Sequence, residues 1–182
     1  MKLRNLAEKD ADGMLSWMHD KEINCVFAND FASFSKEKVL EFINSSVDDK
    51  SCVHYACVDD DDNYLGTVSL KHIDNAAKNA EYAVSFCKSA QGTGAAAYAT
   101  QEILRIGFIE LNLERIYLNV LADNGRANHF YNKMGFVFEG CFAKHIMIKG
   151  VLKDLNWYRL LKEEYKKILL QQNMEISYST FK

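Results

Sequence analysis

A glycine-rich turn between a β-rich first half and an alanine-rich helix is the feature that most constrains this chain. It runs from Gln91 to Ala96 with the sequence QGTGAA, and its two glycines let the backbone approach a ligand that side chains would exclude. Free N–H groups and the positive dipole end at the start of the next helix favour a phosphate or pyrophosphate group. An ordinary strand-to-helix turn is the alternative, because short glycine motifs are weak signals when they stand alone.

Regular elements are expected on both sides of this loop, from hydrophobic periodicity and capping residues. Strands are predicted at 2–5, 52–58, 64–73, 80–86, 115–121, 136–148 and 151–160, and helices after Asp10, after Ser35, at 95–111 and at 124–134. The three strands before the loop have the pattern of an antiparallel meander. The order β-α-α-β-β-β-α-β-α-β-β therefore predicts a mixed α/β (α+β) fold with one crossover.

The composition is typical of one soluble globular domain. The chain has 182 residues, 48% of them hydrophobic, and its formal net charge of −3 gives no broad basic surface for nucleic acid or an anionic membrane. No proline is present, which excludes proline-rich linkers, and no stretch reaches the roughly 18 apolar residues of a membrane span. The basic start lacks the apolar region of a signal peptide. We expect a cytoplasmic monomer or homodimer, with one domain at 1–170 and a C-terminal tail at 171–182.

No metal site is expected. The five cysteines form no CxxC pair, and the five histidines show no ligand spacing. Reduced, mostly buried thiols and structural or surface histidines are the interpretation, with His19 as the exception discussed below. The acidic run from Asp59 to Asp62 lies between two predicted strands and predicts a solvated hairpin turn.

The glycine-rich loop also matches the dinucleotide fingerprint G-x-G-x-x-G/A, so a nucleotide-binding α/β fold has to be weighed. That fingerprint opens a parallel βαβ unit and has an acidic residue about 20 positions later, at the end of the next strand. Here Glu110 and Glu114 precede that strand, and the loop follows strands that look antiparallel. The context therefore argues against a dinucleotide site.

A second motif follows the next predicted strand directly and identifies the family. From Asn124 to Phe136 the chain reads NGRANHFYNKMGF. Together with the loop this resembles the pair Q/R-x-x-G-x-G/A and N-x-x-A-x-x-x-Y-x-K-x-G-F of the GNAT superfamily, the GCN5-related N-acetyltransferases. The flanking sequence resembles its RimJ/RimL-type branch, over roughly residues 1–165.

The resemblance implies an enzyme that transfers an acetyl group from acetyl-CoA to an amine. It implies a mixed, mostly antiparallel central sheet flanked by helices, whose fourth and fifth strands splay apart so that the pantetheine arm inserts between them. The pyrophosphate would lie on the glycine-rich loop. The cofactor-binding residues implied in this way are Ser85, Phe86, Cys87, Gln91, Gly92, Thr93, Gly94, Ala95, Ala96, Asn119 and Asn124.

The chemistry requires a neutral amine, a donor for the developing oxyanion and a proton for the departing thiolate. Tyr131 resembles the usual general acid of the superfamily, and a packing aromatic bonded to the cofactor is its alternative role. Glu81 has the position of the glutamate in the family's A-E-x-G-Y strand and is the predicted base, with a surface glutamate or a water chain as alternatives. Ala83, Val84 and Lys88 depart from the usual glycine, aromatic residue and proline.

The acceptor is predicted less sharply. An α-amine or amino-sugar amine is favoured slightly over a lysine side chain, because an α-amine with a reference pKa of about 7.7–8.0 is partly neutral in the cell, whereas a lysine with a pKa of about 10.4 is not. Three stretches resemble bacterial enzymes that acetylate nucleotide-linked amino sugars, namely WMHD at 17–20, GTVSL at 66–70 and IYLNV at 116–120. We therefore place an amino sugar first, a peptide N-terminus second and a non-catalytic CoA-binding module third. Trp17, His19 and Asn24 are the candidate substrate-binding residues, with core packing as the alternative for Trp17.

Overall fold

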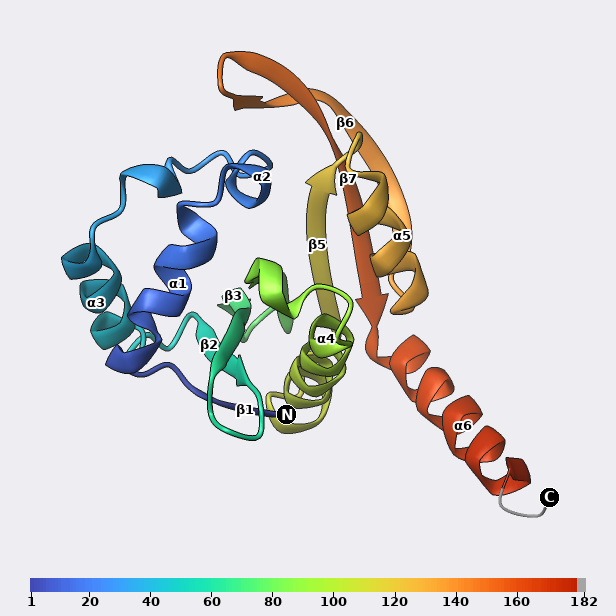
Figure 1. Ribbon diagram of the computed structural model, residues 1–182. Coiled ribbons are helices and arrows are strands. Elements are labelled where there is room, and N and C mark those ends of the chain that lie inside the picture. Colours follow the sequence, from blue (N-terminus) through green and yellow to red (C-terminus); the bar gives the residue numbers. More distant parts are fainter. Residues whose placement is uncertain (180–182) are drawn as a thin grey trace.

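A seven-stranded mixed sheet forms the frame of the molecule in the computed structural model, which describes the backbone of residues 1–179 and the side chains of residues 1–171 (Figure 1). The strands follow the spatial order β1-β2-β3-β4-β5-β7-β6. They are β1 (Lys2–Asn5), β2 (Val53–Val58), β3 (Tyr64–Asp74), β4 (Asn79–Phe86), β5 (Arg115–Leu121), β6 (Val137–Ile148) and β7 (Val151–Leu161). The helices are α1 (Ala11–Met18), α2 (Lys21–Asn24), α3 (Lys36–Ser45), α4 (Ala95–Arg105), α5 (Gly125–Lys133) and α6 (Lys162–Ser179). The predicted mixed, mostly antiparallel α/β fold is confirmed.

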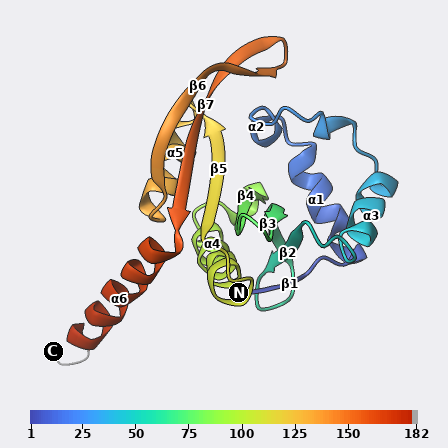
Figure 2. The same cartoon turned by 180° about the vertical axis from the view of Figure 1, so that it is seen from behind.

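Strands β4 and β5 separate soon after they meet. They form the parallel pair of the sheet and are in register only from Asn79 opposite Arg115 to Glu81 opposite Tyr117. Beyond this point β4 stays paired with β3 as far as Phe86, while β5 stays paired with β7 as far as Leu121. Each strand therefore presents an unpaired edge to the other, as the predicted splay requires, and Figure 2 shows both strands from behind.

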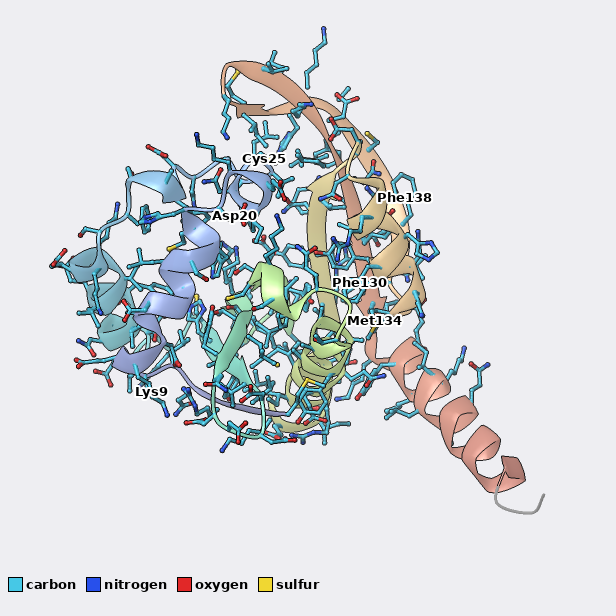
Figure 3. The ribbon with its side chains drawn as sticks, in the orientation of Figure 1. Lys9, Asp20, Cys25, Phe130, Met134 and Phe138 are labelled. Carbon is cyan, nitrogen blue, oxygen red and sulfur yellow. The ribbon has the colours of Figure 1, made fainter. Side chains whose placement is uncertain are left out.

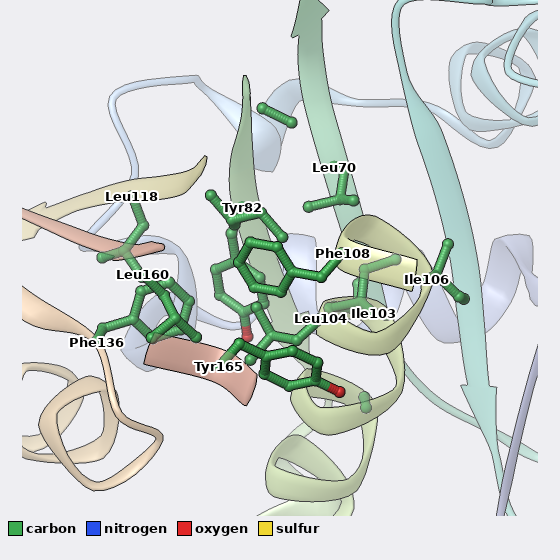
Figure 4. Close-up of a cluster of buried hydrophobic side chains, with 14 of the residues drawn as sticks. Leu70, Tyr82, Ile103, Leu104, Ile106, Phe108, Leu118, Phe136, Leu160 and Tyr165 are labelled. Carbon is green, nitrogen blue, oxygen red and sulfur yellow. The ribbon is translucent and has the colours of Figure 1, made fainter. Parts of the chain in front are cut away.

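Helices cover the two faces of the sheet with separate apolar clusters. Helix α4 buries Ala99, Ile103 and Leu104 against Leu70 and Tyr82 of the sheet (Figure 4). On the opposite face, α1 and α3 pack on β2 through a second cluster that includes Met14, Trp17, Val39, Ile43, Ala56 and Val58. Because side chains alternate along a strand, the two clusters use alternate residues of the same strands.

Local capping explains where two helices begin. Ser35 accepts a hydrogen bond from the backbone N–H of Lys38 and caps α3, as predicted. The expected side-chain cap by Asp10 on α1 is wrong. The buried Asp10 carboxylate instead accepts two hydrogen bonds of 2.7 Å from the Arg4 guanidinium and one from the backbone N–H of Ala7. A buried carboxylate needs a paired cation, and this contact ties β1 to the start of α1.

The predicted helix at 95–111 is divided in two. Helix α4 ends at Arg105, and a wide π-helical turn covers Ile106–Glu110. A Cβ atom at Gly107 would lie 2.6 Å from Ile116 Cδ1, so a larger residue there would require the Ile116 side chain to move. The short helix α2 was not predicted. Helix α6 continues past the predicted boundary at residue 170 and extends away from the sheet (Figures 1 and 2), and the division into domain and tail stays a prediction.

Smaller predictions have mixed outcomes. The hairpin turn at Asp59 is confirmed, since its carboxylate accepts hydrogen bonds from the N–H groups of Asp61 and Asn63. The thiols are free, but only Cys57 and Cys87 are buried, and Cys25 and Cys141 are exposed. Burial raises the pKa of the Cys57 thiol to about 11. Within residues 1–179 the structure has no helix both long and apolar enough to cross a membrane.

Candidate active site

The glycine-rich loop is open where a phosphate would bind. Gly92 and Gly94 have φ angles of +79° and +84°, and a Cβ atom at either position would meet nothing within 4 Å. The Thr93 hydroxyl donates to the carbonyl of Ala90 at 2.7 Å and accepts from the N–H of Ala95 at 3.3 Å, which ties the loop to the first residue of α4, whose N-cap is Gly94. The left-handed conformation that glycine adopts freely thus brings bare backbone to the N-terminus of α4.

A cavity of about 460 Å³ connects this loop to the N-terminus of α5, and we call it the loop cavity; its lining includes Phe86, Gln91, Gly94, Asn124 and Arg126. Arg126 donates a 2.9 Å hydrogen bond to Gln91 Oε1 and so joins α5 to the loop. Asn124 caps α5 by accepting from the N–H of Ala127 at 3.1 Å. An arginine therefore stands beside open N–H groups, in a setting that suits a pyrophosphate.

The space between the diverging strands is a second cavity of about 440 Å³, the gap cavity, whose lining includes Glu81, Val84, Asn119, Asn124 and Tyr131. Figure 3 draws the side chains of this region, with Phe130 of α5 labelled. Tyr131 packs against Tyr82 and Phe136, with ring centroids 6.0 Å away in each case. Burial raises the pKa of Tyr131 to about 12, so its phenol stays protonated at neutral pH. Its hydroxyl makes no hydrogen bond to another described side chain or backbone group.

The unpaired edge of β4 selects which backbone groups face the gap cavity. Residues of an antiparallel pair alternate between exchanging N–H and C=O groups with the partner strand and turning them away. The N–H of Cys87 donates to the carbonyl of Leu65 on β3 at 2.9 Å, and the register therefore turns Ser85 toward β3 as well. Phe86 and Val84 turn their backbone groups into the gap. Of the three predicted residues Phe86 has the suitable orientation, and Val84 was missed because the sequence does not give the register.

Glu81 lies where β4 and β5 part, and its carboxylate is already engaged. Oε1 is 3.5 Å from Lys71 Nζ and 3.4 Å from Asn119 Nδ2, and Oε2 is 3.6 Å from His72 Nε2. One polar cluster therefore contains Asn119, Glu81 and Lys71, although the sequence predicts Asn119 as a cofactor ligand and Glu81 as the base. This cluster forms the boundary between the gap cavity and the next pocket, because Lys71 lines both.

A third cavity, of about 430 Å³, lies between the sheet and the helices α1 and α3; we call it the aromatic pocket. Its walls include Trp17, Phe27, Phe31, Phe34 and Phe42, and its floor includes His54, Ser69, Lys71 and Ala83. Trp17 contacts Phe31 edge-on, with ring centroids 5.2 Å apart. Phe27, Lys71, Ala83 and Val84 line both this pocket and the gap cavity, so the two cavities adjoin.

The predicted substrate-binding residues fall in different places. Trp17 lines the aromatic pocket, and its indole N–H donates to the Tyr64 hydroxyl at 3.2 Å. His19 lies 2.9 Å from the carbonyl of Phe34, and the buried Asn24 donates to the carbonyl of Met18, so both hold the segment between α1 and α3. Neither His19 nor Asn24 is among the described residues that line the three cavities. Their roles in substrate binding stay predictions.

Residues that the sequence did not single out complete the site. His54, Lys71 and Phe27 come from β2, β3 and an irregular segment, and no local motif marks them. Lys88, which stands in place of the family's proline, pairs at 2.6 Å with Glu22 of α2, and Glu22 is one of the residues that line the loop cavity. That ion pair raises the pKa of Lys88.

Comparisons with known proteins agree with this geometry. The family described as Acetyltransferase (GNAT) domain matches residues 1–137. The chain is 30% identical to a spermidine N(1)-acetyltransferase of Vibrio cholerae, over 76% of this chain and 79% of that protein. It is 27% identical to a putative ribosomal N-acetyltransferase of Bacillus subtilis, over 58% of each chain. The solved structure of a spermidine N-acetyltransferase from Vibrio cholerae in complex with CoA and spermine superposes with a TM-score of 0.83 and 27% identity, covering 90% of this chain and 96% of that one.

The cavities fit acetyl-CoA on their own terms. The loop cavity has open N–H groups and Arg126 for the phosphates, and the gap cavity has unpaired strand edges for an amide-bearing arm. Tyr131 lines that gap cavity, and its raised pKa keeps the phenol protonated. The predicted identification is confirmed: the chain belongs to the GNAT acetyltransferase family and is an acetyl-CoA-dependent N-acetyltransferase.

Proposed function

We propose that this enzyme acetylates the primary amine of a nucleotide-linked amino sugar. The observation that carries the proposal is the composition of the aromatic pocket. Its described lining residues include Trp17, four phenylalanines, His54 and Lys71, and none of them is Asp or Glu. A pocket with many rings, one cation and no carboxylate is suited to an acceptor that is planar in part and carries negative charge.

Aromatic side chains and lysine match the parts of a sugar nucleotide. A nucleobase stacked on an aromatic ring gains about 1–3 kcal/mol per base. Lysine is a common point-charge ligand for phosphate. Small residues at the floor, Ser69 and Ala83, leave room beside the sheet for the sugar ring.

Spermidine and spermine, which are named for the relatives, fit this pocket poorly. A polyamine carries several protonated amines, which need carboxylates or unoccupied aromatic faces. Lys71 puts a like charge at the floor, and Lys38 Nζ already lies 3.8 Å from the ring centroid of Phe34. Glu81, an acidic residue beside the floor, is paired with Lys71.

The roles of the residues follow from the geometry. Bound acetyl-CoA supplies a thioester, which the amine attacks with loss of the thiolate. Tyr131, protonated and beside the gap, is the proposed general acid for that thiolate. The backbone groups of Val84 and Phe86 position the pantetheine arm, and the glycine-rich loop with Arg126 holds the pyrophosphate. Glu81 holds Lys71 at the boundary between the gap cavity and the aromatic pocket.

A turnover screen tests the acceptor class. Purified enzyme is given acetyl-CoA and, separately, UDP-linked amino sugars, the free amino sugars, spermidine and peptides with free N-termini, and the released thiol is measured. We expect the largest kcat/KM with a nucleotide-linked amino sugar and at least 10-fold less with the free sugar, which lacks the base and phosphates. Preference for spermidine or for a peptide overturns the proposal, and acetyl-CoA binding without turnover of any amine would favour a non-catalytic module.

A further inference from the structure

His54 is the titratable group of the aromatic pocket that the roles above leave unused. It lies on β2, directly opposite Ser69 on β3, which in turn lies opposite Ala83 on β4. Its Nδ1 atom is 2.7 Å from the Ser69 hydroxyl, so the half-buried ring leans across the sheet toward β4. Neighbouring strands are about 4.8 Å apart, and this direction brings the imidazole toward the boundary with the gap cavity.

The second ring nitrogen of His54 is free for a ligand. No described residue makes a hydrogen bond with Nε2, and the side chain lines the aromatic pocket. When Nδ1–H donates to Ser69 Oγ, the lone pair of Nε2 is available to the pocket. Ser69 therefore fixes both the direction of the ring and, in this tautomer, the nitrogen that can accept a proton.

The surroundings keep the imidazole neutral. Burial lowers the pKa of His54, the charge of Lys71 on β3 lowers it further, and Asp49 in the loop before β2 opposes this shift. The other packed elements add no charge to its face: Phe42 of α3 contacts the ring edge-on at 5.0 Å, and α1 lines the pocket with Met14, Trp17 and Met18. A neutral imidazole can accept a proton at neutral pH, whereas a protonated one cannot.

Glu81 is less suited to the same task. Its Oε1 atom is engaged by Lys71 and Asn119, its Oε2 atom lies 3.6 Å from the exposed His72, and the carboxylate faces the gap beside the polar cluster. We propose that His54 is a catalytic residue that accepts the proton lost by the acceptor amine, with Ser69 as the positioning residue that directs its ring. This rests on the proposed function in one respect, which is that the acceptor enters through the aromatic pocket.

The proton balance closes with groups present in the site. As the C–N bond forms and the C–S bond breaks, His54 Nε2 takes one proton from the neutral amine, and Tyr131 gives its phenolic proton to the leaving thiolate. Exchange with solvent then removes the proton from His54 and returns one to Tyr131. An amine nitrogen becomes far more acidic as it bonds to the acyl carbon, so an imidazole of lowered pKa is basic enough.

Kinetics of two substitutions test the assignment. His54→Gln keeps a side chain of similar size, and we expect kcat to fall about 100-fold with the acetyl-CoA Kd unchanged. The wild-type kcat/KM falls on the acid side as His54 becomes protonated, at a pH below the ordinary histidine range because burial lowers its pKa, and His54→Gln removes that acid limb. In His54→Ala, added imidazole restores part of the activity. His129→Gln, an exposed histidine on α5, is the matched control and leaves kcat, pH profile and Tm unchanged.

A binding readout separates this proposal from the acceptor assignment. Histidine-labelled enzyme is titrated by NMR with the acceptor alone, without acetyl-CoA, and the His54 Nε2 resonance shifts while that of His129 does not. All measurements use whichever amine the enzyme turns over, so failure with amino sugars overturns the proposed function and leaves His54 testable. An intact acid limb in His54→Gln together with its loss in Glu81→Gln, or a silent His54 resonance, overturns the present proposal.

Discussion

The cofactor half and the acceptor half of the site are built by different means. The proposed acetyl-CoA site is formed by one continuous stretch from β4 to α5, and it offers mainly backbone: strand edges, the glycine-rich loop and two helix N-termini. The aromatic pocket is made of side chains from α1, α3, β2, β3, β4 and the irregular segment that contains Phe27. Backbone recognition leaves glycines and capping residues in the sequence, whereas side-chain recognition depends on which distant residues share a face.

Tyr131→Phe has the largest expected effect on the cofactor half of the site, because it removes the phenolic hydroxyl and keeps the packing of the ring. The phenol is the proposed proton donor to the thiolate, so its loss should lower kcat about 100-fold, within the range of general acid catalysis. The acetyl-CoA Kd, measured by calorimetry, should stay within about 2-fold because the ring packing is retained. An unchanged kcat would contradict the assignment.

The raised pKa of Tyr131 also predicts how activity depends on pH. Because burial raises the pKa of Tyr131 to about 12, the neutral phenol persists well above its ordinary range near 10. Its contribution to stability is complete below about pH 10 and is lost as the pH rises through about 12. Activity should therefore show no basic limb from Tyr131 up to pH 10, in a profile of kcat against pH.

Gly94→Ala tests the claim that bare backbone binds the pyrophosphate. At a φ of +84° an alanine is strained by roughly 1–2 kcal/mol, and the loop should shift to relieve it. We expect acetyl-CoA to bind about 10-fold more weakly, by calorimetry, with the acceptor KM unchanged. Gly140→Ala on β6 is the control, since a Cβ atom there meets nothing within 4 Å and φ is not positive, and it should bind acetyl-CoA as the wild type does.

Lys71→Gln tests the acceptor half. Removing a partly exposed cation worth about 1 kcal/mol should raise KM for an anionic acceptor roughly 3- to 5-fold and lower it for spermidine. The acetyl-CoA Kd should not change. Lys78→Gln, in the exposed turn before β4, controls for net charge, and equal effects of the two substitutions would show that Lys71 has no special contact with the acceptor.

Lys88→Pro has the smallest expected effect. Cys87 has φ −60° and ψ 152°, which suits the residue before a proline, and Lys88 begins a helical turn, where proline is tolerated. A gain of about 0.4–1 kcal/mol from reduced unfolded-state freedom offsets the lost exposed ion pair with Glu22. Tm should change by less than about 3 °C and the acetyl-CoA Kd not at all. Weaker acetyl-CoA binding would show that Lys88 contacts the phosphates.

The success of the sequence predictions differs along the chain for a physical reason. The strands, the α3 cap at Ser35 and the two helices of the cofactor half were predicted because periodicity and capping are local. Asp10 was assigned as a helix cap because its partner Arg4 is recognised only once β1 lies beside α1. The π-helical turn at Gly107 depends on the closeness of Ile116, which no local pattern shows.

The predicted site residues also differ according to whether a local motif or the strand register fixes their orientation. Gly92, Gly94 and Tyr131 lie where the motifs place them, while Ser85 and Cys87 turn their backbone toward β3 because strand register decides the orientation. Glu81 lies at the splay, but its base role stays a prediction, as its partners Lys71 and His72 were not foreseen.

By itself the sequence determined the family, the cofactor and the glycine-rich loop proposed to hold it, because recognition by backbone needs glycines, a helix start and a fixed spacing along the chain. Only the tertiary structure assembled the aromatic pocket on which the proposed acceptor rests. His54, Ser69 and Ala83 meet because three antiparallel strands align in one register, and Trp17 and Phe31 close over them from outside the sheet. Contacts between residues far apart in the sequence are set by the free energy of packing the whole sheet. No single segment of the sequence predicts them.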